Sequence, residues 1–142
     1  MKWAALITWV LTAGGGFVLF AIWLKNGGMA QREGRRIRPP LVLGHFALAA
    51  VGLVLWIIYV ASDSEALAWV AFILLLAVAA LGFTMFAIWM GQRRGRGGDV
   101  TASPAAAEPA EQRFPVAVVG LHGLLAATTL VLVFLATVGV GS

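Results

Sequence analysis

Residues 40–62 read PLVLGHFALAAVGLVLWIIYVAS, a run with no Asp, Glu, Lys or Arg. A helix of this length rises about 34 Å at 1.5 Å per residue, which is enough to cross the hydrocarbon core of a bilayer. Three further apolar stretches without these charged residues occupy residues 3–24, 66–90 and 115–140. A backbone in lipid must satisfy its own hydrogen bonds, and strict apolar–polar alternation is absent. The pattern therefore predicts an all-α integral membrane protein with four transmembrane helices, not a β-barrel.

The composition excludes several other classes of protein. The 142 residues are 61% hydrophobic and 11% charged, whereas a soluble domain would be about a quarter charged. There is no Cys, which excludes a disulfide scaffold, a thiolate metal site and a cysteine nucleophile. The first apolar stretch is too long for the core of a typical signal peptide, so we expect it to be a retained span.

The basic residues predict the orientation in the membrane. The loop between the second and third stretches has Asp63 and Glu65 and no base, and Lys2 is the only base near a terminus. The positive-inside rule therefore places the two long loops in the cytoplasm and both termini outside. Eight Arg against two Lys, with abundant Ala, Gly and Val, favour a GC-rich bacterial genome, so we expect a bacterial plasma membrane. The net charge of +4 thus reflects topology and not nucleic-acid binding. The loop bases are Lys25, Arg32, Arg35, Arg36 and Arg38 in the first, and Arg93, Arg94, Arg96 and Arg113 in the second.

Aromatic residues stand at the ends of the predicted spans, as in the aromatic belts of membrane interfaces. The sequence therefore predicts that they lie at the two membrane surfaces. The residues are Trp23 and Trp89 on the cytoplasmic side, and Trp56, Tyr59 and Trp69 on the outer side.

Two blocks of sequence recur. GFVLFAIWL at residues 16–24 matches GFTMFAIWM at 82–90 with an offset of 66, and HFALAAVGLVL at 45–55 matches HGLLAATTLVL at 122–132 with an offset of 77. The pattern predicts a tandem duplication of a two-helix hairpin, residues 1–62 and 66–142. The Gly-, Pro- and Ala-rich residues 92–114 form a flexible linker inside the second repeat. Both halves enter the membrane from the same side, so their pseudo-twofold axis runs along the membrane normal.

The only two histidines, His45 and His122, are repeat mates. Each lies a few residues inside its span, so the two imidazoles are expected at similar depth and facing each other. Polar residues inside a membrane usually face the bundle interior and mark function. Two imidazoles on opposite faces of one ring are what a bis-histidine haem requires. Small residues one and two turns beyond each histidine would shape the pocket; they are Ala49, Gly52, Ala126 and Thr129. Two arginines, Arg38 and Arg113, would bind the haem propionates.

On His45, His122 and the four-helix layout, the chain resembles the four-helix membrane cytochromes b. The resemblance implies one haem b, with electron transfer or haem and redox sensing as the activity. Most such families carry two haems on four histidines, whereas this chain has two histidines. Transmembrane electron transfer would therefore need a redox partner protein or a quinone.

Other functions stay open at this stage. Met85 could join the two histidines in a copper site, since imidazole and thioether suit copper. A cofactor-free accessory or assembly subunit, as a homodimer or within a larger complex, is a second class, and a small transporter is a third. Side-chain catalysis has little support, because the acidic loop residues lack a partner motif and are expected to be solvated; they are Glu33, Asp99, Glu108 and Glu111.

Overall fold

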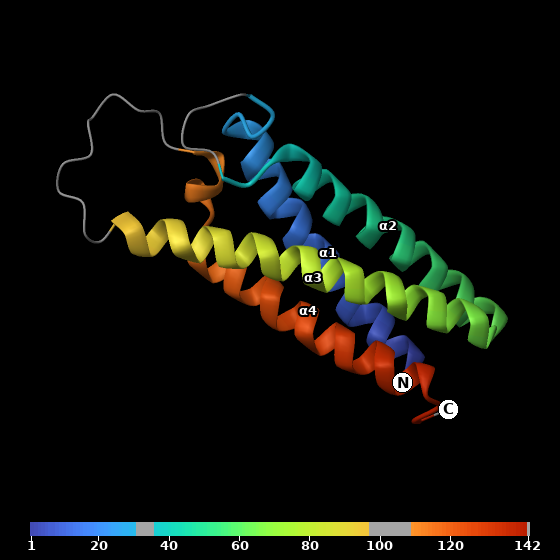
Figure 1. Ribbon diagram of the computed structural model, residues 1–142. Coiled ribbons are helices and arrows are strands. Elements are labelled where there is room, and N and C mark those ends of the chain that lie inside the picture. The colour runs from blue at the N-terminus through green and yellow to red at the C-terminus, as the bar shows by residue number, and fades with distance from the viewer. Residues whose placement is uncertain (31–35, 97–108, 142) are drawn as a thin grey trace.

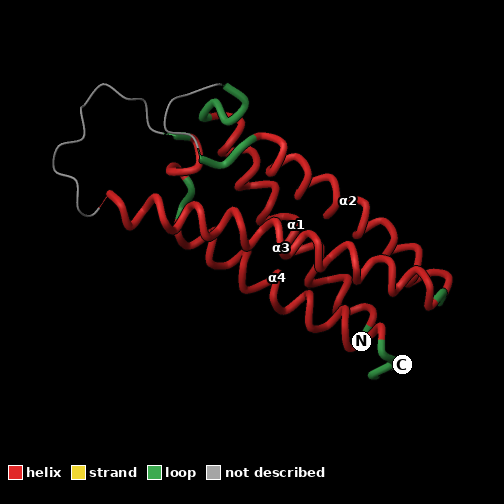
Figure 2. The backbone as a smooth tube through the Cα atoms, viewed as in Figure 1, coloured by secondary structure: helices red, strands yellow, loops and turns green. Residues whose placement is uncertain are grey.

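The computed structural model describes residues 1–30, 36–96 and 109–141, which form an all-helical bundle without a β-strand (Figures 1 and 2). All four long helices are long and apolar enough to cross a membrane, as the sequence predicts. They are α1 (Lys2–Lys25), α2 (Pro39–Ser62), α3 (Glu65–Arg96) and α4 (Val116–Thr137), and a short 3-10 helix, η1 (Ala110–Arg113), precedes α4.

Two helix ends differ from the predicted spans. Helix α3 continues to Arg96, six residues further than expected, and α4 stops at Thr137. Gly139 has a φ of +82°, and the N–H of Val140 donates to the carbonyl of Leu135 at 2.9 Å. This is the Schellman arrangement, in which a glycine in the left-handed region ends a helix. The apolar run continues past Thr137, but the glycine prevents the helix from doing so.

The two ends of the bundle carry different connections (Figure 1). One end, here the terminal end, holds both chain termini and the turn between α2 and α3. Asp63 forms that turn with a φ of 52°. The other end, here the loop end, holds the α1–α2 and α3–α4 connections. Helix α1 packs mainly against α4, and α2 packs mainly against α3.

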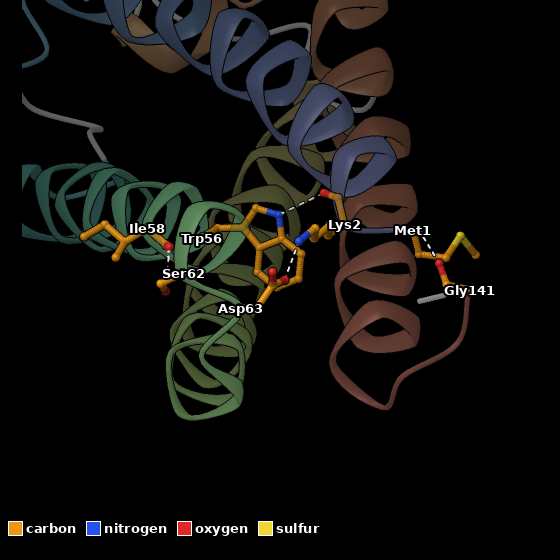
Figure 3. Close-up of polar contacts among 7 residues, drawn as sticks. All are labelled: Met1, Lys2, Trp56, Ile58, Ser62, Asp63 and Gly141. Atoms are coloured by element: carbon orange, nitrogen blue, oxygen red, sulfur yellow. Dashed lines mark hydrogen bonds and ion pairs between the residues drawn. The ribbon is translucent and has the colours of Figure 1, made fainter.

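Polar contacts close the terminal end (Figure 3). The amino group of Met1 donates to the carbonyl of Gly141 at 3.1 Å. Lys2 forms an ion pair with Asp63, and the indole N–H of Trp56 donates to the Lys2 carbonyl at 3.3 Å. These contacts join both termini and the α2–α3 turn.

The outer surface of the bundle is strongly apolar. Phe83 is 72% exposed, Leu124 67% and Trp3 62%. Large apolar side chains spread over every helix would aggregate in water, whereas in a bilayer they face lipid.

Most buried side chains lie in two layers, one at each end of the bundle. The terminal core consists of Ala5, Trp9, Trp56, Val60, Ala68, Ala71, Leu75, Val133 and Ala136. The loop-end layer consists of Trp23, Ile37, Trp89, Ala110 and Glu111.

The segments between these layers contain half-buried and exposed residues. We call residues 13–22, 39–51, 79–88 and 116–128 the histidine layer, because they contain His45 and His122. All of them are described, and not one is buried. The fully buried side chains therefore lie on either side of the histidine layer and not within it.

Part of the predicted linker is helical. Of residues 92–114, predicted to form a flexible linker, 92–96 belong to α3, 110–113 form η1, and 97–108 lie outside the described residues.

The prediction that Glu111 is solvated is wrong, because its side chain is fully buried. Its Oε1 accepts hydrogen bonds from the backbone N–H of Arg36 at 3.2 Å and of Ile37 at 3.4 Å, and from Gln92 Nε2 at 3.2 Å. One carboxylate thus ties both long connections to α3. The remaining acidic loop residues, Glu33, Asp99 and Glu108, lie outside the described residues.

Candidate functional site

The structure brings the two histidines together within one chain. The ring centroids of His45 on α2 and His122 on α4 are 6.5 Å apart, and the ring planes are inclined at 64°. Both side chains are half-buried in the histidine layer. The meeting does not require a second copy of the chain.

Each imidazole is held by a backbone carbonyl on the helix that it packs against. His45 Nδ1 lies 3.0 Å from the Val78 carbonyl oxygen on α3, and His122 Nδ1 lies 3.0 Å from the Thr12 carbonyl oxygen on α1. A carbonyl can only accept, so both Nδ1 atoms carry the proton and donate. In a neutral imidazole this leaves the lone pair on Nε2, the tautomer that binds metal through Nε2. Outer hydrogen bonds of this kind usually orient metal-binding histidines.

Glycines allow the rings to approach those helices. A Cβ added to Gly16 would lie 3.1 Å from His122 Cε1, and one added to Gly82 would lie 3.1 Å from His45 Cε1. Either contact is closer than ordinary van der Waals packing permits. Gly16 and Gly82 therefore leave the room that the two rings occupy.

The contacts on the two sides stand at the sequence offsets of the repeat. Val78 and Gly82 follow Thr12 and Gly16 by 66 residues, the offset of the first repeated block. The two histidines are 77 residues apart in the sequence, which is the offset of the second block. Each histidine thus makes the contacts of its mate, on the corresponding helix of the other half.

The predicted pocket residues lie in different surroundings. Ala49 and Ala126, one turn from the histidines, are half-buried. Gly52 packs against α1, because a Cβ there would meet Trp9 Cζ2 at 3.1 Å. Thr129 is buried, and its hydroxyl lies 3.1 Å from that of Thr12. Gly52 and Thr129 thus hold neighbouring helices together on the terminal side of the histidines.

The remaining predicted ligand residues lie closer to the loop end. The side chains of Arg38 and Arg113 are exposed there. Met85 is half-buried on α3, one turn from Gly82 towards the loop end. Among the described residues, no group of three or more His, Asp or Glu side chains could hold a metal ion. The two histidines form a pair, which could supply both axial ligands of one haem iron.

The prediction of aromatic belts is wrong for Trp23, Trp56 and Trp89. Trp23 and Trp56 are completely buried and Trp89 is 3% exposed, so all three lie inside the bundle. Tyr59 is half-buried, and Trp69 is 44% exposed. The block of sequence that recurs at residues 16–24 and 82–90 contains a signal for burial: Trp23 follows Gly16 by seven residues and Trp89 follows Gly82 by seven. That spacing puts each tryptophan on the same helix face as a glycine that contacts a histidine.

Comparison with known proteins identifies no relative: no protein family, no curated protein and no solved structure matches the chain.

Proposed function

We propose that the protein is a small membrane cytochrome that binds one b-type haem between His45 and His122, for electron transfer or for haem and redox sensing. One observation carries the proposal. Two imidazoles, each with its Nδ1 held by a backbone carbonyl, lie with ring centroids 6.5 Å apart in the layer of the bundle where no side chain is buried.

The ring separation supports ligation of one iron by both histidines. Two metal–nitrogen bonds of about 2 Å and two imidazole radii of about 1 Å place the ring centroids about 6 Å apart when the ligands are opposite each other. The observed separation is 6.5 Å. The residues present therefore fit a bis-histidine haem.

When bound, the haem would supply reversible one-electron chemistry. The chain's own contribution is positioning and exclusion of water. The Val78 and Thr12 carbonyls fix both Nδ1 protons, and the two glycines set the depth of the rings. The terminal core and the loop-end layer close the histidine layer on both sides. Because this layer covers part of the membrane thickness, electron transfer across the whole bilayer would involve a redox partner or a quinone.

In the proposed bacterial plasma membrane, the charge distribution supports a cytoplasmic location for the long loops. Asp63 and Glu65 are exposed at the terminal end. The offsets shared by the sequence blocks and the histidine contacts support a tandem duplication with a pseudo-twofold axis along the membrane normal. The exposed cations at the loop end are Lys25, Arg36, Arg38, Arg93, Arg94 and Arg113.

Oxidised and dithionite-reduced absorption spectra of the detergent-purified protein test the proposal. We expect the sharp reduced α-band of a b-type haem, and we expect its loss in both His45→Ala and His122→Ala. Gly120→Ala is a matched control near His122, since a Cβ there has no neighbour within 4 Å. A wild-type protein that stays colourless after expression with added haem would contradict the proposal and favour a cofactor-free accessory subunit.

A further inference from the structure

Two buried indole groups lack a hydrogen-bond partner. Trp23 is completely buried and Trp89 is 3% exposed, and neither Nε1 has a partner within the described part of the chain. An unsatisfied buried N–H group is costly, and most such groups in folded proteins are paired. Trp23 and Trp89 occupy corresponding positions of the recurring sequence block, and both indole N–H groups are unpaired within the residues that the structure describes. This points to a missing acceptor for each indole.

The two tryptophans lie on the face of the helix that meets the histidines. Trp23 follows Gly16 on α1 by seven residues and Trp89 follows Gly82 on α3 by seven, so each pair is separated by about two turns, ~10.5 Å along the axis. Side chains lean towards the N-terminus of their own helix. On α1 and α3 this direction leads from the loop end towards the histidines.

Neighbouring groups hold both indoles in place. Phe20 stacks on Trp23 with ring centroids 6.0 Å apart, and its counterpart Phe86 lies 5.9 Å from Trp89. The Arg93 guanidinium covers the Trp89 ring at 5.1 Å. These contacts hold both indole rings within the loop-end layer.

We propose that Trp23 and Trp89 each donate an indole hydrogen bond to one haem propionate. The assignment rests on the proposed function. A b-type haem has two propionate carboxylates on one edge, and the bundle offers two buried donors related by the same offset of 66 as the histidine contacts. The propionates would then point to the loop end, with these tryptophans as nearer partners than the exposed Arg38 and Arg113.

Glu111 offers a competing use of the same donors. Its Oε2 is also buried without a partner among the described residues. A buried water could join this oxygen to the indole N–H groups, since buried waters typically bridge such unsatisfied atoms. In that case the tryptophans would stabilise the loop end and have no effect on propionate binding.

The test compares two iron porphyrins in the detergent-purified apoprotein. One is haem b, and the other is iron etioporphyrin, which has no propionates. The variants are Trp23→Phe, Trp89→Phe and the double variant. The control is Trp69→Phe, at an exposed tryptophan near the terminal end. The measurement is the dissociation rate of each porphyrin into an excess of a haem-scavenging protein.

We expect each loop-end variant to release haem b roughly tenfold to a hundredfold faster, as for loss of a hydrogen bond to a charged group. Release of iron etioporphyrin should remain as in the wild type, which also shows that the variants are folded. The proposal is overturned if both porphyrins are released equally faster, or if the variants behave like Trp69→Phe. A wild type that binds neither porphyrin refutes the haem proposal itself, and this assignment with it.

Discussion

Replacing Gly16 by alanine should weaken haem binding through a defined displacement of His122. The new Cβ would lie 3.1 Å from His122 Cε1, 3.7 Å from Nδ1 and 4.0 Å from Nε2. The ring must move by a few tenths of an ångström, away from α1. That movement lengthens the 3.0 Å hydrogen bond from Nδ1 to the Thr12 carbonyl, which fixes the ring.

The expected cost combines two effects. An extra methyl group in a packed site costs about 1–3 kcal/mol, and an interhelical hydrogen bond in a membrane is worth about 0.6 kcal/mol. A summed loss of about 1.6–3.6 kcal/mol of haem binding energy corresponds to roughly a 15-fold to 450-fold rise in Kd. Gly82→Ala should behave similarly, because its Cβ would meet His45 at the same distance.

Haem titration of the apoprotein, followed by absorbance, measures this effect. Gly14→Ala is the control, because it lies two residues away on the same helix and a Cβ there has no neighbour within 4 Å. We expect its Kd to stay within about twofold of the wild type, as for an exposed substitution. If Gly16→Ala and Gly14→Ala bind haem equally well, the reasoning about ring placement is wrong.

Three further substitutions separate the roles of other contacts. Glu111→Ala leaves the N–H groups that bond to Glu111 without an acceptor, so the melting temperature should fall clearly. Glu111→Gln should lower it less, because the amide oxygen can still accept; equal melting temperatures for the two variants would contradict this. Thr129→Val removes the hydroxyl contact with Thr12, and the free energy of unfolding should drop by about 0.6 kcal/mol. Chemical denaturation in mixed micelles measures this drop, and a much larger loss would contradict the prediction. Lys2→Ala breaks an ion pair with the mostly exposed Asp63, so the change should stay below about 1 kcal/mol; a salt-independent loss above this limit would show that the pair has a structural role.

The helices could be predicted from sequence because long uncharged apolar runs leave few alternatives in a membrane. The predicted positions of the helix ends were less accurate, since a single left-handed residue, Gly139, ends α4 inside an apolar run. The meeting of His45 and His122 was predictable because the repeat places both at one depth. Their carbonyl partners were not, since these contacts depend on how closely the helices approach.

The errors at the loop end have a common physical origin. A tryptophan near the end of a span suits both the lipid interface and the bundle interior, and only the packing of neighbouring segments distinguishes the two. The burial of Glu111 also depends on the packing of neighbouring segments, because η1 folds back onto α1 and α3. Sequence alone gives no sign of that return.

Electron paramagnetic resonance of the oxidised, haem-loaded protein tests the central claim most directly, because the signal reports the axial ligands of the iron. We expect one haem per chain with a low-spin ferric signal, converted to high spin or lost in both His45→Ala and His122→Ala. A low-spin signal that survives either substitution, or a wild type that takes up no haem, would contradict the account.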